Sequence, residues 1–368
     1  MRKYKNNILF FSSGRSEYNL IEPLINKLKG KAKINILITG THISKKYGLT
    51  KKKINLSFLK KFFLKLDVEN NSKKSLLSNS TKVINFISKN FNKKKIDSAV
   101  IIGDRYEALC FAYALKILDI PIIHIHGGEI TKNSLDDVFR FCISKMSSLH
   151  FVSHEIHAKR LIKIGLDRNT IHNFGGLGAS IAKDKKLLDK KSLEKIYNFK
   201  FWKKNFIVTF HPEMNIDESL KKLRNIFTAC KKCTDINFLI TYPNFDYGAD
   251  LLIKIIEKNK NENNIKLIKN FNEDLYSVMS HCNGIIGNSS SAILEAPSFG
   301  IFTINIGNRQ KGRIFAKTII NTNGPSKDLV KKIIKVSKLK RLSNCNLYYK
   351  SNTFSKIANK IIQKRFGK

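Results

Sequence analysis

The feature that most constrains the fold is a regular alternation of short apolar runs with amphipathic segments along nearly the whole chain. Continuous apolar strands that alternate with amphipathic helices are typical of parallel sheets covered by helices on both faces. The sequence therefore predicts an α/β protein. Strands are expected at residues 8–13, 34–40, 99–103, 121–126, 149–153 and 170–174, and again at 206–210, 238–242, 265–268, 284–287 and 302–306.

The alternation falls into two blocks, which predicts two Rossmann-like domains, each a doubly wound parallel sheet. We place the domains at residues 1–178 and 179–350, with a C-terminal segment at 351–368, because the stretch between Gly178 and Lys204 is Lys-rich. The polar region Lys45–Ser80 is expected to be loop with short helical pieces. Ligands of such sheets bind beyond the carboxyl ends of the strands, so a cleft between two facing domains would collect the strand-end residues.

Composition narrows the class of partner. The 368 residues carry a formal net charge of +40, mostly from Lys spread over the polar segments, without an arginine-rich arm or an aromatic-interleaved basic stripe. We therefore expect no nucleic-acid partner. No segment approaches the ~18 consecutive apolar residues of a membrane span, so no membrane partner is expected. The six scattered cysteines favour a cytoplasmic protein with free thiols, and the lone Cys230–Cys233 CxxC predicts no metal site.

Polar residues follow the predicted strands of the first domain, where the carboxyl ends of parallel strands meet. They are Arg15, Asp104, Arg105, His126 and Glu129. Asp104 has an alternative reading as the N-cap of a helix at 105–118. Asp136 and Asp137 open another predicted helix, and Arg140 lies one turn later, within reach of either carboxylate. His124 shares a strand face with His126; His124 is expected to be packed in the core, and His126 is expected to lie nearer the rim.

The stretch Gly287–Arg313 has the pattern of a site for a nucleotide phosphate. Residues 288–291 (Asn-Ser-Ser-Ser) can cap a helix predicted at Ala292–Phe299, and the free N–H groups of a first helical turn can hold a phosphate. Glu295 lies one turn further on, where its carboxylate could accept hydrogen bonds from ribose hydroxyls. Three cations follow the predicted strand at 302–306, namely Arg309, Lys311 and Arg313. His211 follows the predicted strand at 206–210.

At these positions the chain resembles the UDP-N-acetylglucosamine 2-epimerases, and most closely the hydrolysing branch of bacterial sialic-acid biosynthesis. The matching segments occur in order and span most of the chain. They are SSGRSEY (12–18), GDRYEA (103–108), HIHGGE (124–129), DDVFR (136–140), ISKMSSLHFVS (143–153), FHPE (210–213) and GNSSSAILEAPSFG…INIGNRQKGR (287–313).

The resemblance implies a GT-B fold, in which two Rossmann-like domains hold a UDP-sugar in the cleft between them. A final helix, about Thr353–Arg365, would cross back to the N-terminal domain. In the implied reaction a base removes the C2 proton while UDP is eliminated, and water then adds to the 2-acetamidoglucal. The products would be UDP and N-acetylmannosamine. No cofactor or metal is implied, and because relatives form dimers or tetramers we expect a homo-oligomer.

The resemblance also implies roles by motif position. Ser289 and Ser290 would hold the diphosphate and Glu295 the ribose, while His211, Arg309 and Arg15 would complement phosphate charge. Proton transfer would fall to Asp104, Glu129 and Asp136 or Asp137, oriented by Arg140. The catalytic candidates are thus Asp104, His126, Glu129, Asp136, Asp137, Arg140 and His211. The UDP-binding candidates are Arg15, Arg105, Ser289, Ser290, Glu295, Arg309 and Arg313.

Two departures from the family pattern matter. A glutamate, usually counted as catalytic, commonly stands where this chain has His126. Either Glu129 or His126 would take over its catalytic role, and the sequence does not distinguish the two. The arginine of non-hydrolysing relatives is absent after Glu129, where Ile130 and Thr131 follow, which supports the hydrolysing branch. The diacetamido-trideoxyglucose substrate of legionaminic acid synthesis is an alternative. A GT-B glycosyltransferase is another, but it would not need the carboxylate set.

Overall fold

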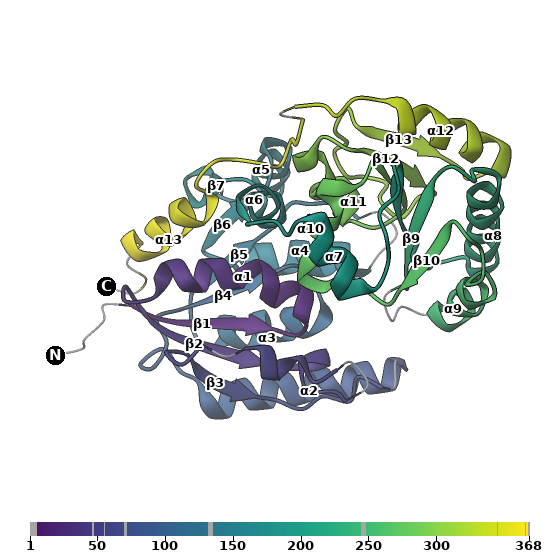
Figure 1. Cartoon of the computed structure of the whole chain (residues 1–368). Helices are drawn as coiled ribbons and strands as arrows, with labels where there is room; N and C mark the ends of the chain where they lie inside the picture. Colours follow the sequence, from purple (N-terminus) through teal and green to yellow (C-terminus); the bar gives the residue numbers. More distant parts are fainter. Residues whose placement is uncertain are drawn as a thin grey trace. The chain divides into compact units, whose positions relative to one another are not determined.

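The computed structural model describes residues 6–45, 48–54, 56–69, 72–131, 135–243, 248–343, 345–364 and 366. The chain divides into two compact units (Figure 1). The first contains residues 1–180 and 350–368, and the second contains residues 181–349. Each unit is built on one parallel sheet, as the alternation predicts.

The sheet of the first unit has seven strands in the order β3-β2-β1-β4-β5-β6-β7, all paired in parallel. The strands are β1 Asn7–Ser12, β2 Lys33–Ile38, β3 Lys60–Phe63, β4 Ser98–Ile102, β5 Ile122–Ile125, β6 Leu149–Val152 and β7 Ile171–Asn173. The helices are α1 Arg15–Leu28, α2 Lys73–Asn90, α3 Tyr106–Ile117, α4 Leu135–Met146 and α5 Glu155–Lys163, with 3-10 turns at Gly40–His42, Thr50–Lys53 and Arg168–Thr170. α6 Leu177–Asp184 runs across the boundary into the second unit.

The prediction for Lys45–Ser80, loop with short helical pieces, misses a strand and underestimates the length of a helix. Residues Lys60–Phe63 form β3, an edge strand that pairs with β2. α2 begins at Lys73, where the hydroxyl of Ser72 caps it by accepting from the Ser75 N–H at 3.2 Å. The Lys-rich composition hides both elements, because an edge strand buries few of its side chains and a helix start depends on a local cap.

The sheet of the second unit has six strands in the order β10-β9-β8-β11-β12-β13, again all parallel. The strands are β8 Asn205–Thr209, β9 Asn237–Thr241, β10 Ile265–Ile268, β11 Gly284–Gly287, β12 Phe302–Ile306 and β13 Ile319–Thr322. The helices are α7 Lys190–Tyr197, α8 Ile216–Lys232, α9 Ala249–Lys258, α10 Leu275–His281, α11 Ser291–Leu294 and α12 Ser326–Lys338, with 3-10 turns at Asn272–Asp274 and Ala296–Phe299.

Both faces of this sheet are covered, which explains the continuous apolar strands. Along β8, Phe206 and Val208 face one core with side chains of α8 and α12, while Ile207 faces a second core with side chains of α10 and α11. Cys230 and Cys233 are buried in the first of these cores. The short edge strand β13 was not predicted. Three of its four residues are only partly buried and the fourth is exposed.

The C-terminal helix α13, Thr353–Gln363, belongs to the first unit and packs against α1 (Figure 1). The predicted end of this helix, Arg365, lies outside the described residues. The hydroxyl of Thr353 ties the helix start to this unit by donating to the backbone oxygen of Phe174 at 2.7 Å.

Each sheet has a point where the strand order reverses. In the first unit β1 lies between β2 and β4, and in the second β8 lies between β9 and β11. At such a switch the loops that follow two neighbouring strands diverge to opposite faces, which leaves room for a ligand. The loop after β1 ends at Arg15, the first residue of α1, and the loops after β4, β8 and β11 carry Asp104, His211 and Ser289.

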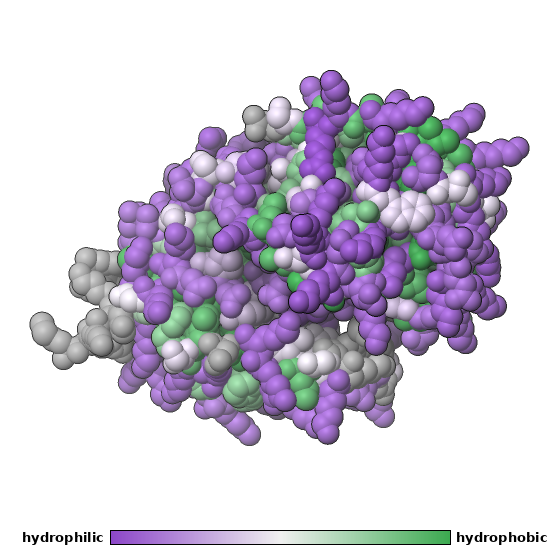
Figure 2. Space-filling view, viewed as in Figure 1, coloured by the Kyte–Doolittle hydropathy of each residue, from purple (hydrophilic) through white to green (hydrophobic). Residues whose placement is uncertain are grey.

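Hydrophilic side chains cover most of the face shown in Figure 2, over both units. Within the described residues, no helix is both long and apolar enough to cross a membrane.

Candidate functional site

Arg140 is the centre of a polar network in the first unit. α4 places its guanidinium where it is buried, with 3% of the residue exposed. Nη1 donates to the backbone oxygen of Glu129 at 2.8 Å and to Asp137 Oδ1 at 2.9 Å, while Nη2 donates to Asp104 Oδ2 and to Thr131 Oγ1. The structure thus brings Asp104, Glu129 and Asp137 together around one planar, permanently charged group.

Asp104 does not cap the helix that follows it. α3 begins at Tyr106, its N-cap residue is Arg105, and no side chain caps it. The Asp104 carboxylate is instead engaged by Arg140, so the alternative reading as a helix cap is wrong. Asp137 also accepts a hydrogen bond from the Thr131 N–H at 2.8 Å. Asp136 is exposed at the start of α4, and Asp137 is the partner that Arg140 takes.

The loop after β5 holds Glu129 in a fixed conformation. His126 has φ 68° and Gly128 has φ 75°, so the chain turns through the left-handed region twice. A Cβ at Gly128 would lie 2.4 Å from the backbone oxygen of His157, which leaves room only for glycine. Arg160 Nη1 donates to the Gly128 oxygen at 3.2 Å. This close packing leaves Glu129 with 5% of its surface exposed.

The ring of His126 is oriented towards Glu129. Nε2 accepts a hydrogen bond from the Leu177 N–H at 3.2 Å, so the neutral ring carries its proton on Nδ1. Nδ1 lies 3.7 Å from Glu129 Oε1. His124, by contrast, is fully buried and hydrogen-bonded to Ser144 and Gly103, and burial lowers its pKa to about 3. The prediction that His124 packs in the core while His126 lies nearer the rim is confirmed.

Two carboxylates that the sequence reasoning did not single out lie near Arg105. Glu107, fully buried, accepts two hydrogen bonds from the Arg105 guanidinium, each at 3.2 Å. Glu17, in the first turn of α1, accepts from Ser13 N–H at 2.7 Å, and desolvation raises its pKa to about 7 although Arg105 opposes that shift. The signal was present, since both lie inside the segments SSGRSEY and GDRYEA.

In the second unit, Asn288 joins the two loops at the sheet's switch point. Its Oδ1 accepts from the His211 N–H at 2.7 Å and its Nδ2 donates to the His211 oxygen at 2.9 Å. Gln310 Nε2 donates to the Asn288 oxygen at 2.8 Å. His211 is therefore held at the carboxyl end of β8, next to Ser289. Burial, reinforced by the nearby Arg309, lowers the pKa of His211 to about 3, so its ring is neutral near pH 7.

Glu213 fixes the backbone around Arg309. Its Oε1 accepts from the N–H groups of Asn308 and Arg309 at 2.7 and 2.9 Å, and its Oε2 accepts from Lys222 Nζ at 2.6 Å. Gly307 has φ 80°, and a Cβ there would lie 2.5 Å from Glu213 Oε1. The glycine lets the loop after β12 close onto this carboxylate. The segment FHPE contains Glu213, but no local sequence pattern pairs Glu213 with Lys222 or with Asn308 and Arg309.

The helix predicted at Ala292–Phe299 is wrong in its form. α11 spans only Ser291–Leu294, and a 3-10 turn follows at Ala296–Phe299. Pro297 has no N–H to bond to Ile293, so the α-helical ladder cannot continue. The expected cap is also absent, because the N-cap residue Ser290 makes no side-chain cap hydrogen bond.

The side chains of this segment lie as follows. Ser289 and Ser291 bond to each other through their hydroxyls at 2.9 Å. Glu295, at the break, is buried beside Tyr276. Arg15, Arg309 and Arg313 are each partly exposed, and the structure places Arg309 near His211.

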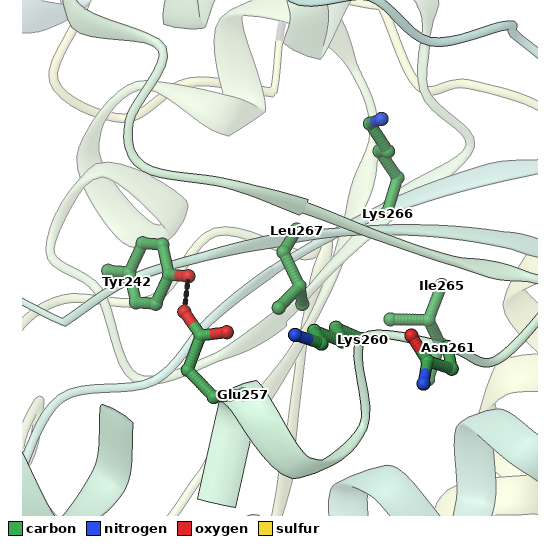
Figure 3. Close-up of a pocket in the computed structure, with 7 residues that line it drawn as sticks. All are labelled: Tyr242, Glu257, Lys260, Asn261, Ile265, Lys266 and Leu267. Atoms are coloured by element: carbon green, nitrogen blue, oxygen red, sulfur yellow. Dashed lines mark hydrogen bonds between the residues drawn. The ribbon is translucent and has the colours of Figure 1, made fainter. Parts of the chain in front are cut away.

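A separate pocket of about 290 Å³ lies on the second unit between α9 and β10 (Figure 3). Tyr242 donates a hydrogen bond to Glu257 across one wall, and Lys260, Asn261 and Lys266 line the rest with Ile265 and Leu267. None of the predicted site residues lines it. Its charged groups carry both signs, so we do not assign the pocket to the predicted site.

Comparison with known proteins agrees with the motifs. The sequence profile of the family described as UDP-N-acetylglucosamine 2-epimerase matches residues 26–362. A GDP/UDP-N,N'-diacetylbacillosamine 2-epimerase (hydrolyzing) of Campylobacter jejuni is 35% identical over 324 residues, which cover 86% of this chain and 84% of that protein. The polysialic acid biosynthesis protein P7 of Escherichia coli is 31% identical over 360 residues, which cover 94% and 90%.

The fold also has a close counterpart among solved structures. The crystal structure of UDP-GlcNAc 2-epimerase from Neisseria meningitidis bound to UDP-GlcNAc has a TM-score of 0.79 at 19% identity, and the match covers 97% of this chain and 100% of that one. At this identity the likeness concerns the fold alone. Together with the two parallel sheets, it confirms the predicted GT-B architecture of two Rossmann-like domains.

Proposed function

Because the chain belongs to the UDP-N-acetylglucosamine 2-epimerase family, we propose that it is a hydrolysing 2-epimerase. It would convert a UDP-linked 2-acetamido sugar and water into UDP and the free 2-acetamido sugar inverted at C2. The observation that carries this proposal is the Arg140 network, which assembles Asp104, Glu129 and Asp137. Elimination across C1–C2 needs positioned proton donors and acceptors, and a simple glycosyl transfer does not need this set.

The first half of the reaction removes the C2 proton and breaks the C1–O bond to UDP. A carboxylate is a suitable base for this step if it is held in a fixed geometry. Asp104 and Glu129 are the candidates, because Arg140 holds the Asp104 carboxylate and the Glu129 backbone together. We assign them to the two proton transfers at C2 without choosing which acts first.

The second half adds water across the C1–C2 double bond of the glucal. One group delivers a proton to C2 from the opposite face, and another accepts a proton from the attacking water. The contact between His126 Nδ1 and Glu129 Oε1, 3.7 Å, supports a shared duty for the two residues at the position where relatives carry a glutamate. Asp137, oriented by Arg140, is the third carboxylate of the set, and Asp136 stands beside it.

Departure of UDP requires stabilisation of the diphosphate. We assign this to the second unit's strand-end loops, with Ser289, Ser290, Arg309 and Arg313 towards the phosphates and Glu295 towards the ribose. Arg15 and Arg105 of the first unit remain candidates for the same ligand. Because burial lowers the pKa of His211 to about 3, its ring would donate a hydrogen bond, and the arginines would supply the positive charge.

Two substrates fit this reaction. UDP-N-acetylglucosamine, which would give N-acetylmannosamine for sialic-acid-type sugars, is the first. UDP-N,N'-diacetylbacillosamine, the diacetamido-trideoxyglucose alternative, is the second, and the 35% identity to the Campylobacter jejuni relative supports it. The reacting atoms C1 and C2 and the diphosphate are the same in both substrates, so the choice depends on what contacts C4 and C6 of the sugar.

The decisive experiment is incubation of the enzyme with each UDP-sugar in deuterated water, followed by NMR. We expect UDP and a free manno-configured 2-acetamido sugar that carries deuterium at C2. Release of the gluco sugar without deuterium would mean ordinary hydrolysis and would overturn the proposal. Return of a UDP-linked manno sugar would place the chain in the non-hydrolysing branch. The ratio of kcat/KM for the two substrates identifies the physiological one.

The same assay tests the residue assignments. Asp104→Asn and Glu129→Gln should each lower kcat by at least about 100-fold, since general acid–base catalysis contributes roughly 100- to 10,000-fold. UDP affinity, measured by calorimetry, should change little in either variant. If both variants keep wild-type turnover, the assignment of proton transfer to these carboxylates is wrong.

A further inference from the structure

A hydrogen-bonded chain reaches the Glu129 carboxylate from α5. Ser153, directly after β6, donates from Oγ to Glu129 Oε1 at 3.0 Å. The same Oγ lies 3.0 Å from His157 Nδ1. Because the serine proton points to the carboxylate, Oγ must accept from His157, whose neutral ring therefore carries its proton on Nδ1. The chain runs His157 Nδ1–H to Ser153 Oγ–H to Glu129 Oε1.

All three members of this chain are buried. Glu129 is 5% exposed, and Ser153 and His157 are each 2% exposed. Burial lowers the pKa of His157 to about 4, so its ring is neutral near pH 7 and acts as a hydrogen-bond donor, not as a cation. A hydroxyl that donates to a carboxylate stabilises the charged form, and the effect is larger where water is excluded.

α5 also fixes the backbone on which Glu129 stands. Gly128 packs so closely on the His157 carbonyl that a Cβ would lie 2.4 Å from that oxygen. Arg160, one turn further along α5, donates to the Gly128 oxygen. Arg140 of α4 donates to the next backbone oxygen, that of Glu129. The loop is thus clamped at consecutive residues by two helices.

We propose that Ser153 and His157 are positioning residues for the reaction: they hold the Glu129 carboxylate in a fixed orientation through Oε1 and stabilise its ionised form. This inference rests on the proposed function for its catalytic meaning. Its structural part, that Ser153 stabilises the ionised form of Glu129, stands apart from it. Among the described residues, the charged or titratable groups around Glu129 include His126 on its own loop, Arg140 of α4 with its partners Asp104 and Asp137, and His157 with Arg160 on α5.

The first test needs no turnover. In protein labelled with carbon-13 at the glutamate carboxyls, the Glu129 signal is assigned by its loss in Glu129→Gln and then titrated. Ser153→Ala should raise the pKa of Glu129 by about one unit, the shift expected when a carboxylate loses one charge-assisted hydrogen bond. An unchanged Glu129 titration in a folded Ser153→Ala variant would overturn the proposal, whatever the enzyme's substrate proves to be.

The second test uses kinetics. Ser153→Ala should lower kcat by roughly 10- to 100-fold with less than about a threefold change in KM, and should move one limb of the kcat–pH profile upward, since misplacement of a catalytic group costs about that much. His157→Asn, whose amide can replace the Nδ1–H donor, should keep most of kcat, whereas His157→Leu should resemble Ser153→Ala. Equal loss in both His157 variants would contradict a positioning role through Nδ1.

A matched control separates positioning from general damage. Ser147, directly after α4 in the same unit, donates its hydroxyl to the Ile143 backbone oxygen at 2.7 Å. Ser147→Ala removes a comparable hydrogen bond and should leave the kcat and the pH profile unchanged. If Ser153→Ala unfolds, Ser153→Thr, which keeps the hydroxyl, must restore the wild-type profile, and failure to do so counts against the proposal. If wild type turns over no UDP-sugar, the proposed function fails while the titration still decides the inference.

Discussion

At the scale of single residues, Arg140 has the most demanding geometry. Its planar fork donates to Asp104, Asp137, Thr131 and the Glu129 backbone, and a lysine ammonium cannot reach these acceptors in two directions. We expect Arg140→Lys to lower the free energy of unfolding by about 2 kcal/mol, the loss of about two buried hydrogen bonds, and to abolish measurable turnover. Urea denaturation and the deuterium assay check this, with the exposed Arg224→Lys as control. A variant with normal stability and turnover would refute the role of the fork.

Glu17 gives a prediction about how stability depends on pH. Burial raises its pKa to about 7 in the folded protein, against about 4.5 when unfolded. Folding is therefore favoured by this group at low pH, and the contribution is lost as pH rises through about 7. Glu17→Gln should raise Tm at pH 8 relative to wild type and change it little at pH 5. The exposed Glu69→Gln is the matched control, and a Tm difference that does not depend on pH would contradict the assignment.

At the scale of elements, the loop after β12 depends on a carboxylate from the loop after β8. Glu213 accepts from two backbone N–H groups and from Lys222, and so fixes Arg309. Glu213→Gln places an amide against donors, so we expect the loop to loosen and UDP affinity to fall about tenfold, or about 1.4 kcal/mol. Glu218→Gln is the control, because Glu218 is 61% exposed on its side chain and 3.7 Å from the same lysine. Calorimetry with UDP should distinguish the two variants, and equal affinities would argue against the clamp.

Helices and strands whose side chains are buried could be predicted from the sequence. Edge strands and helix ends, which depend on a few local residues, were missed. The buried strands follow from their apolar runs, so β8, β9 and β11 lie within a residue of their predicted bounds. The partly buried edge strands β3 and β13 carry no such run. The prediction of a helix at Ala292–Phe299 was wrong because Pro297 ends the α-helical hydrogen-bond pattern. The prediction of a serine cap was wrong because the hydroxyls of Ser289 and Ser291 bond to each other.

At the scale of the whole molecule, the sequence was sufficient for two parallel α/β units, because continuous apolar strands require helices on both faces. It also placed the polar residues at strand ends, where the Arg140 network and the His211–Asn288 pair lie. It could not supply the partners within each site. The hydrogen bond from Ser153 to Glu129 joins residues 24 positions apart in sequence, and no local pattern encodes it.

The buried histidines make stability sensitive to acid across the whole protein. Burial lowers the pKa of His42, His150 and His157 to about 4 and that of His124 and His211 to about 3. The unfolded chain, with histidine pKa values near 6.5, binds more protons below that pH, so the stabilisation present above pH ~6.5 is lost as pH falls towards 4. Each such histidine should add up to about 1.4 kcal/mol per pH unit to the slope of unfolding free energy against pH.

His150 is the histidine to replace in a test, because its Nδ1 has no hydrogen-bond partner among the described residues. Denaturation at closely spaced pH values from 7.5 to 5 should give a slope that, near pH 5, is almost one proton smaller for His150→Leu than for wild type. An identical slope there would show that His150 does not contribute.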